Sequence, residues 1–301
     1  MRDTELHLAA GTTATYGDPV VVTPESAGWE LCGLRVLRLA PGAERMLVTG
    51  DDEYALLPLS GGRVKVEVDG RRFDLDGRRT VFERVTDWAY VPRDSELRLS
   101  SGDGCELALA SSRANRRFEP VRVAAGEVAI EIRGAASATR QVTNFLIPEE
   151  FEGADKLICC ELLTPDGNWS SYPPHKHDDT AGSPVWNEEI YYFRIGRAGS
   201  VEYAPDGYGT HRTYTHDGSI DTTVTVRDGD VFLVPRGYHG PCAAAPGYPM
   251  YYLNVMAGTG AGRVMAFADD PAHAWIRETW RELQPDPRCP LTSAEGPTWR
   301  P

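Results

Sequence analysis

Short runs in which apolar and polar residues alternate recur along the whole chain and predict β-strands. The sharpest is RVKVEVDGRRFDL, where every second residue from Val64 to Val68 is valine and Asp69-Gly70 follows. An Asp-Gly pair suits a two-residue turn, so residues 64–75 are predicted to form an antiparallel hairpin. Comparable runs in the second half are KLICCELLTP, EEIYYFRI, TTVTVRDGDVFLVP and MYYLNVMAG. The pattern therefore predicts a largely all-β protein.

One helix is predicted near the C-terminus, where Asp270 can cap it, Pro271 suits its first turn, and roughly helical spacing continues to Leu283. A strand that ends in Val-Pro-Arg occurs in each half, in WAYVPRDSELRL and in DVFLVPRGYHG, which indicates a weak internal duplication. We therefore expect two tandem antiparallel β-barrels of the jelly-roll kind, 1–125 and 126–301, with a short C-terminal helix.

The composition excludes several classes of protein. The formal net charge of −13 repels phosphate backbones and anionic membranes, so neither nucleic acid nor a membrane is expected as a partner. No apolar stretch reaches the roughly 18 to 20 residues of a membrane helix, and the first residues lack the features of a signal peptide. The 6 cysteines include no CxxC pair, which indicates reduced thiols and a cytoplasmic protein.

Two histidines one residue apart define the candidate site. His175 and His177 lie in SSYPPHKHDD, and an extended backbone would present both imidazoles on one face. Glu189 begins the aromatic strand EIYYFRIG, and His239 follows the strand GDVFLVP in a turn. Three imidazoles and one carboxylate would form an open site for a first-row divalent metal, with positions left for substrate or water. Glu188 is the weaker ligand candidate, because neighbours on a strand point to opposite faces and only Glu189 keeps the spacing to Gly196.

The spacing of these residues resembles the two signature motifs of the cupin superfamily. Gly196 follows Glu189 after 6 residues, and the segment from Gly229 to His239 carries the glycines and the proline of the second motif. The first half has no equivalent histidines. We therefore expect the barrel of residues 1–125 to lack metal ligands and to be structural or dimer-forming.

Several longer blocks resemble a single family. They are NWSSYPPHKHD, EEIYYFRI, DGDVFLVPRGYH, YYLNVMAG, ATRQVTN, DDPAHAWIRETW and, in the first half, VFERVTDWAYVP. Together they are similar to the 5-deoxy-glucuronate isomerases of myo-inositol catabolism, which belong to the bicupin sugar-uronate isomerases. The resemblance implies a metal-dependent aldose-ketose isomerase that interconverts 5-deoxy-D-glucuronate and 5-dehydro-2-deoxy-D-gluconate. It also implies a homo-oligomer with Zn or Mn as the leading metals and Fe, Co or Ni as alternatives.

The implied chemistry suits such a site. A metal that binds the C1 carbonyl and the neighbouring hydroxyl would act as a Lewis acid while hydrogen moves between C1 and C2, as a proton or as a hydride. A proton route needs a base close to that carbon. Tyr252 is the leading acid-base candidate, and Asp178, Glu188 and His211 are available by residue type. His211 and His216 are otherwise expected in a surface loop.

The substrate carboxylate requires a cationic receptor, for which arginine and lysine are the usual residues. The candidates inside the family-like blocks are Lys176, Arg194, Arg236 and Arg140. Lys176 should point away from the face of the two histidines if that segment is regular. Gly240 stands where the family pattern has a proline after the last histidine, which leaves the exact sugar acid open.

Two further hypotheses come from other classes of protein. The same three-histidine, one-glutamate shell with open positions also suits an iron-dependent cupin oxygenase, which oxygen consumption would reveal. A non-catalytic sugar-binding or storage bicupin is the other, although the Tyr, Trp and charged residues around the ligands argue against it. An isomerase of a related sugar acid is the nearest alternative.

Overall fold

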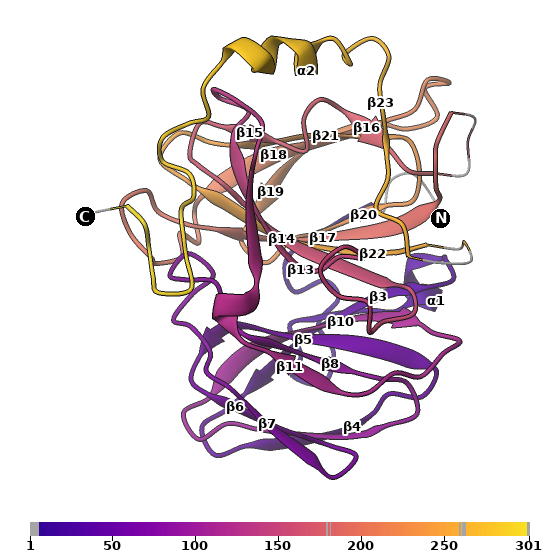
Figure 1. Ribbon diagram of the computed structural model, residues 1–301, viewed down its shortest axis with the longest axis vertical. Helices are drawn as coiled ribbons and strands as arrows, with labels where there is room; N and C mark the ends of the chain where they lie inside the picture. The colour runs from indigo at the N-terminus through magenta and orange to yellow at the C-terminus, as the bar shows by residue number, and fades with distance from the viewer. Residues whose placement is uncertain (1–5, 179, 181, 259, 261–262, 300–301) are drawn as a thin grey trace.

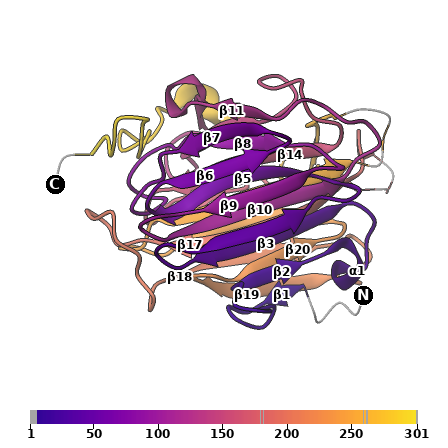
Figure 2. The ribbon, with the colours of Figure 1, turned by 90° about the horizontal axis from the view of Figure 1, so that it is seen from below.

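The computed structural model describes residues 6–178, 180, 182–258, 260 and 263–299. Within these ranges the chain forms two halves, each made of two facing β-sheets, which are stacked along the long axis of the molecule (Figure 1). Seen from below, the strands of the first half cover those of the second (Figure 2). The expected all-β fold of two tandem barrel-like units with a short C-terminal helix is confirmed.

The first half combines a six-stranded and a four-stranded sheet among the described residues. In spatial order, the larger sheet consists of β11 (Val121–Val123), β8 (Trp88–Val91), β5 (Asp52–Gly61), β10 (Cys105–Arg113), β3 (Cys32–Leu39) and β2 (Val20–Val22). The smaller sheet consists of β4 (Glu44–Val48), β9 (Glu96–Ser100), β6 (Val64–Val68) and β7 (Arg71–Leu75). The expected hairpin is β6 and β7, and both Asp69 (φ 51°) and Gly70 (φ 79°) adopt the left-handed backbone that its tight turn requires.

The second half combines a seven-stranded and a six-stranded sheet, counted over the same described ranges. The larger sheet consists of β1 (His7–Leu8), β20 (Val231–Val234), β17 (Asn187–Ile195), β22 (Met250–Gly258), β14 (Leu157–Thr164), β13 (Arg140–Leu146) and β12 (Ala129–Arg133). The other consists of β19 (Asp221–Arg227), β18 (Tyr208–Tyr214), β21 (Tyr238–Ala244), β16 (His175–Lys176) and β23 (Ala268–Asp269), with β15 (Trp169–Ser170) also paired to β21.

The seven-stranded sheet is buried on both faces because it lies between the two halves. Alternate residues of β22 therefore enter different cores. Tyr251 and Leu253 pack against the first half, whereas Met250 and Tyr252 face the interior of the second. This explains why β14, β17 and β22 have near-continuous apolar runs instead of strict alternation.

The chain passes from the first half to the second between β11 and β12, through the 3₁₀-helix η2 (Ala125–Glu127). Two features tie the halves together across this passage. The short strand β1, from the beginning of the described chain, pairs with β20 in the second half. The buried guanidinium of Arg78 forms an ion pair with the buried carboxylate of Glu161 on β14.

The helices are short. The predicted C-terminal helix is α2 (Ile276–Thr279), continued by the 3₁₀-helix η3 (Trp280–Glu282) and preceded by a turn in which Asp270 Oδ1 accepts the N–H of Ala272. It lies at the end of the second half that is farther from the first half (Figure 1). An unpredicted helix, α1 (Pro24–Ala27), is capped by Thr23, whose side chain accepts the N–H of Ser26.

Candidate metal centre and its cavity

Alternation along β17 aims Glu189 into the second half. Glu189, Tyr191 and Phe193 point between its two sheets, whereas Glu188 and Ile190 point toward the first half. Glu189 is 1% exposed. The central strand therefore carries one carboxylate into an otherwise apolar and aromatic interior.

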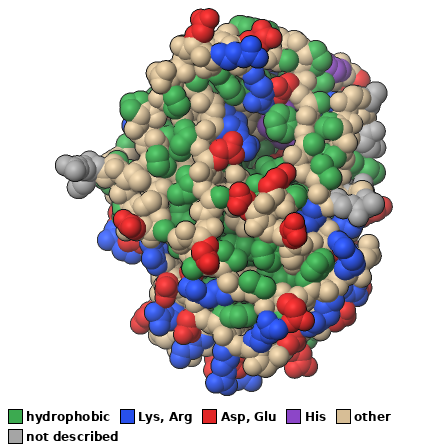
Figure 3. All heavy atoms as spheres, in the orientation of Figure 1, with side chains coloured by type: hydrophobic (Ala, Val, Ile, Leu, Met, Phe, Trp, Pro, Cys, Tyr) green, Lys and Arg blue, Asp and Glu red, His purple; other side chains and the backbone are tan. Residues whose placement is uncertain are grey.

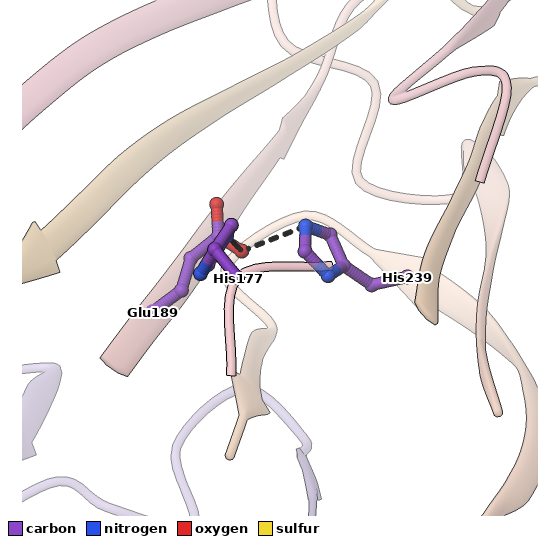
Figure 4. A group of neighbouring side chains, drawn as sticks. All are labelled: His177, Glu189 and His239. Carbon is purple, nitrogen blue, oxygen red and sulfur yellow. Dashed lines mark hydrogen bonds and ion pairs between the residues drawn. The ribbon is translucent and has the colours of Figure 1, made fainter. Parts of the chain in front are cut away.

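Two histidines reach this carboxylate from the facing sheet. His239 belongs to β21, and His177 directly follows β16. The Nε2 atoms of His177 and His239 lie 3.1 and 3.0 Å from Oε2 of Glu189 (Figure 4). Donor atoms that share one first-row ion at bond lengths of about 2.1 Å lie roughly 3.0 to 3.4 Å apart. The three residues can therefore hold a divalent metal ion, with one ligand atom of each within 4.8 Å of the others.

The hydrogen bonds of the two imidazoles fit a bound cation. His177 Nδ1 lies 3.0 Å from the carbonyl of Asn187, which fixes the ring and directs Nε2 toward Glu189. His239 is fully buried, its Nδ1 has no hydrogen-bond partner among the described residues, and its Nε2 lies 3.0 Å from Glu189 Oε2 without the alignment of a hydrogen bond. A buried polar atom without a partner is costly. An ion shared by Nε2 of His239 and the carboxylate of Glu189 would give this nitrogen a well-oriented partner.

His175 stands next to this group. It is the direct register partner of His239 across β16 and β21, and the centroids of the two rings lie 4.4 Å apart. Its Nδ1 is 3.2 Å from the carbonyl of Pro173, an arrangement like that of His177. His175 is not within the three-residue group, but it borders the same cavity. Its role as the fourth ligand stays a prediction.

The electrostatics of the cluster keep the carboxylate ionised. Burial alone would raise the pKa of Glu189, but the imidazoles of His239 and His177 hold it well below the usual value. Burial opposes the charged form of His177, whereas Glu189 raises its pKa overall. Burial and the two neighbouring imidazoles lower the pKa of His175 well below the usual value. An ionised carboxylate is the form that a metal ion requires of Glu189, and a neutral imidazole, which the lowered pKa of His175 favours, is the form that it requires of a histidine.

The cavity beside the cluster is lined by aromatic, polar and cationic side chains. They include Tyr252, Asn254, Arg133, Arg140 and Arg277. In Figure 3, basic and histidine side chains lie inside a hollow on the face that carries α2. Tyr252 is fully buried, its hydroxyl donates to Ser170 Oγ at 3.1 Å, and burial raises its pKa well above the usual value. Its hydroxyl therefore remains protonated at neutral pH, which suits a hydrogen-bond donor or acid.

Three predicted carboxylate receptors lie elsewhere, which corrects the sequence-based hypothesis. Lys176 faces the opposite side of its strand, where its ammonium is 3.5 Å from Asp178 and borders a different cavity. Arg194 is buried between the halves, paired with Glu106 and stacked on a tyrosine. Arg236 lies outside the cavity and contacts Ser219 at 3.2 Å. Of the four candidates, Arg140 borders the cavity.

The alternative bases Glu188, Asp178 and His211 do not line the cavity. Glu188 accepts the backbone N–H groups of Glu30, Leu31 and Cys32 in the first half. Asp178 accepts the N–H of Gly237 at 2.8 Å and does not border the cavity. His211 was expected in a surface loop, but it is fully buried in β18, and burial lowers its pKa to about 3.

The sequence-based reasoning missed Arg133 and Arg277. Arg277 lies in the block AWIRETW, but a charged residue of a short surface helix carries no signal that it turns inward. Arg133 ends the alternating run AIEIR on β12, and its position depends on the register with β13. In the first half, the described residues contain no group of ligand atoms comparable to His177, Glu189 and His239.

Two stacked β-sandwich units with a His/Glu/His cluster inside one of them define a bicupin with a candidate metal centre. Comparison with known proteins places the chain more narrowly. It belongs to the KduI/IolB family, whose model matches residues 7–276. A 5-deoxy-glucuronate isomerase of Geobacillus kaustophilus is 41% identical over 266 residues, which cover 87% of this chain and 92% of that protein. The 5-deoxy-glucuronate isomerase of Bacillus subtilis (strain 168) is 35% identical over 85% of this chain and 92% of its own length. The expected family and the expected enzyme class, an isomerase, are thereby confirmed.

Solved structures support the fold. An IolB-like protein from Salmonella typhimurium superimposes with a TM-score of 0.82 at 33% identity, over 91% of this chain and 99% of that one. A mutant oxalate decarboxylase of Bacillus subtilis superimposes with a TM-score of 0.61 at 15% identity, over 88% and 79% of the two chains. The second similarity concerns the fold alone. No helix among the described residues is long and apolar enough to cross a membrane.

Proposed function

We propose that this protein is a metal-dependent isomerase that interconverts 5-deoxy-D-glucuronate and 5-dehydro-2-deoxy-D-gluconate. The relatives named 5-deoxy-glucuronate isomerase, at up to 41% identity over most of the chain, support the substrate. The observation that carries the metal dependence is the buried His177, Glu189 and His239 cluster, in which the Nε2 atoms of both histidines lie within 3.1 Å of one carboxylate oxygen. The proposal keeps the cytoplasmic location and the homo-oligomer expected from the sequence.

The ligands proposed for the metal are His177, Glu189 and His239, with His175 as the fourth. Zn or Mn is the proposed ion, and Fe, Co and Ni are the alternatives that this donor set also accepts. When bound, a divalent ion supplies Lewis acidity that stabilises negative charge on the carbonyl and hydroxyl oxygens of the substrate. Glu189 lowers the net charge of such a site, and the hydrogen bond from His177 to Asn187 holds its ring in place.

The remaining residues orient the sugar and handle its protons. The Tyr252 hydroxyl, which burial keeps protonated, borders the cavity and would donate a hydrogen bond to a substrate oxygen by turning away from Ser170 Oγ. Asn254, on the same face of β22, has a buried side-chain oxygen without a hydrogen-bond partner among the described residues. A substrate hydroxyl is the group that would satisfy it. The surrounding rings of Tyr191 and Phe267 exclude bulk water from the reacting carbons.

The proposal is tested by incubating the metal-loaded protein with 5-deoxy-D-glucuronate under argon and recording NMR spectra. We expect the resonances of the ketose to grow at the expense of those of the aldose without any oxygen consumption. His177→Ala should remove most of the bound metal and nearly all turnover, because it deletes one of three buried ligands. His216→Ala, which changes an exposed histidine in a turn, is the matched control and should keep both. Absence of conversion with Zn, Mn, Fe, Co and Ni alike would contradict the proposal.

A further inference from the structure

Three arginines converge on the cavity beside the candidate metal centre. Arg133 and Arg140 come from the neighbouring strands β12 and β13, and Arg277 comes from α2. Arg133 and Arg140 are direct register partners in the antiparallel pair. Like charges placed opposite each other destabilise a sheet, so this arrangement is unfavourable for folding alone.

Two of the three arginines have their own counter-ions. Arg133 forms a bidentate pair with Glu131, at 3.0 Å from Nε to Oε1 and 2.6 Å from Nη2 to Oε2. Arg277 forms a bidentate pair with Asp269, at 2.7 Å from Nη2 to Oδ1. Fork-to-fork pairs of this kind fix the orientation of the guanidinium plane. These two arginines are therefore held at the cavity with most of their charge neutralised.

Arg140 has no such partner. It is 4% exposed, and no carboxylate within the described part of the chain forms an ion pair with it. Its Nη1 donates to the carbonyl oxygens of Ala138 at 3.1 Å and Tyr172 at 3.4 Å, and its Nε has no hydrogen-bond partner. Trp280 lies below the guanidinium, with the ring centroid 5.9 Å away. Burying a cation costs free energy unless an anion pairs with it.

The guanidinium of Arg140 remains charged. Burial, together with the charges of Arg133 and Arg277, lowers its pKa to about 10, which is still well above neutral pH. With Glu131 and Asp269 neutralising the two flanking arginines, one positive charge remains in this part of the cavity. A single carboxylate on the ligand would balance it.

We infer that Arg140 is the receptor for the carboxylate of the substrate, and that Arg133 and Arg277 flank it, so that the cavity selects monoanionic sugar acids over neutral sugars. This inference rests on the proposed function and adds to it the residue that binds the carboxylate end of the substrate. A carboxylate bound at the guanidinium would also offer a partner to the buried Nε, which has none among the described residues. The carbonyl end of the same molecule then lies toward His177 and Glu189, which line the same cavity.

The test compares Arg140→Met and Arg140→Lys with the matched control Arg236→Met, which removes an arginine that contacts Ser219 outside the cavity. Binding of D-glucuronate and of D-glucose to each metal-loaded protein is measured by calorimetry, and kcat and KM are measured with 5-deoxy-D-glucuronate. Metal content and the urea midpoint of unfolding are recorded for every variant.

We expect Arg140→Met to weaken glucuronate binding and to raise KM by about 100-fold, because hydrogen bonds to a charged group are lost. Its preference for glucuronate over glucose should disappear, whereas its metal content and unfolding midpoint should stay close to those of the wild type. Arg140→Lys should restore part of the preference, since lysine keeps the charge but not the planar fork. Arg236→Met should behave as the wild type.

The inference is overturned if Arg140→Met still prefers glucuronate, or if it loses stability while its KM is unchanged, which would indicate a purely structural arginine. The proposed function fails separately. If the wild type binds glucuronate through Arg140 but does not convert 5-deoxy-D-glucuronate, the inference about the anion site stands and the proposed isomerase activity is refuted.

Discussion

Gly240 is the residue at which a single methyl group should disturb the candidate site most. It follows His239 on β21 and has φ +99°, a backbone conformation that side chains disfavour. A Cβ atom built there would lie 1.7 Å from the carbonyl oxygen of Ser171, which is backbone and cannot rotate away. Ser171 begins the segment that leads to His175. In Gly240→Ala the segment carrying the first histidines must therefore move away from β21.

The expected magnitude follows from two terms. Placing an alanine at positive φ costs about 1 to 2 kcal/mol. Forcing extra volume into a packed contact costs about 1 to 3 kcal/mol more. Gly247→Ala is the matched control, because Gly247 has φ +86° but nothing within 4 Å of a built Cβ. Gly240→Ala should therefore lower the free energy of unfolding by about 2 to 5 kcal/mol, and Gly247→Ala by the first term alone.

Urea unfolding followed by circular dichroism measures the difference through the shift of the midpoint at constant slope. Metal titration of the folded variants gives a second readout, in which Gly240→Ala should bind more weakly and Gly247→Ala should match the wild type. Equal losses of stability in the two variants would show that the contact with Ser171 has no energetic consequence, and the reasoning would be refuted.

Three other predictions concern separate parts of the molecule. Tyr252→Phe should lower kcat by roughly 100-fold or more while the metal stays bound, because a proton or hydrogen-bond donor is lost. The control is Tyr251→Phe, which should leave the steady-state kinetics unchanged because Tyr251 faces the first half. Arg78→Met should lower the free energy of unfolding by about 3 to 5 kcal/mol, because it leaves the buried Glu161 carboxylate unpaired; a loss below 1 kcal/mol in denaturant titrations would argue against a buried pair. Burial would raise the pKa of Asp270, but hydrogen bonds from Tyr214 and from a backbone N–H hold it below 3.8. Its carboxylate therefore adds stability above about pH 4 that is lost as the pH falls below this value, so Asp270→Asn should be less stable than the wild type at pH 6, and the difference should shrink as the pH falls below about 4. A stability gap that does not change with pH would contradict that assignment.

The elements that could be predicted from the sequence are those set by local patterns. The β6–β7 hairpin follows from alternating valines and an Asp-Gly turn, and both lie within 12 residues of one another. The residues proposed as metal ligands could be found because histidine and glutamate at such spacings are rare in buried strands, so residue type alone carries information. The choice of Glu189 over Glu188 followed from its spacing to Gly196, because neighbouring residues of one strand face opposite sides of the sheet.

The cationic receptors could not be predicted in the same way, because their positions depend on contacts between distant segments. Arg194 looked available for substrate, but it meets Glu106 from the other half, a partner 88 positions away. Arg133 borders the cavity because β12 pairs with β13 in the register that places Arg133 opposite Arg140, and this register could not be read from the sequence. His211 lies in a polar run that resembles a loop, yet it is part of β18, and its strand position turns it inward.

The most direct test of the central claim is a titration of the chelator-treated protein with Mn²⁺ or Zn²⁺, in which conversion of 5-deoxy-D-glucuronate is followed by NMR under argon. If His177, Glu189 and His239 hold the ion that the reaction requires, activity should be absent without metal and should reach its plateau at one ion per chain. Glu189→Gln should neither bind the ion tightly nor recover activity. Full turnover by the metal-free protein, or normal metal binding and turnover by Glu189→Gln, would contradict the account.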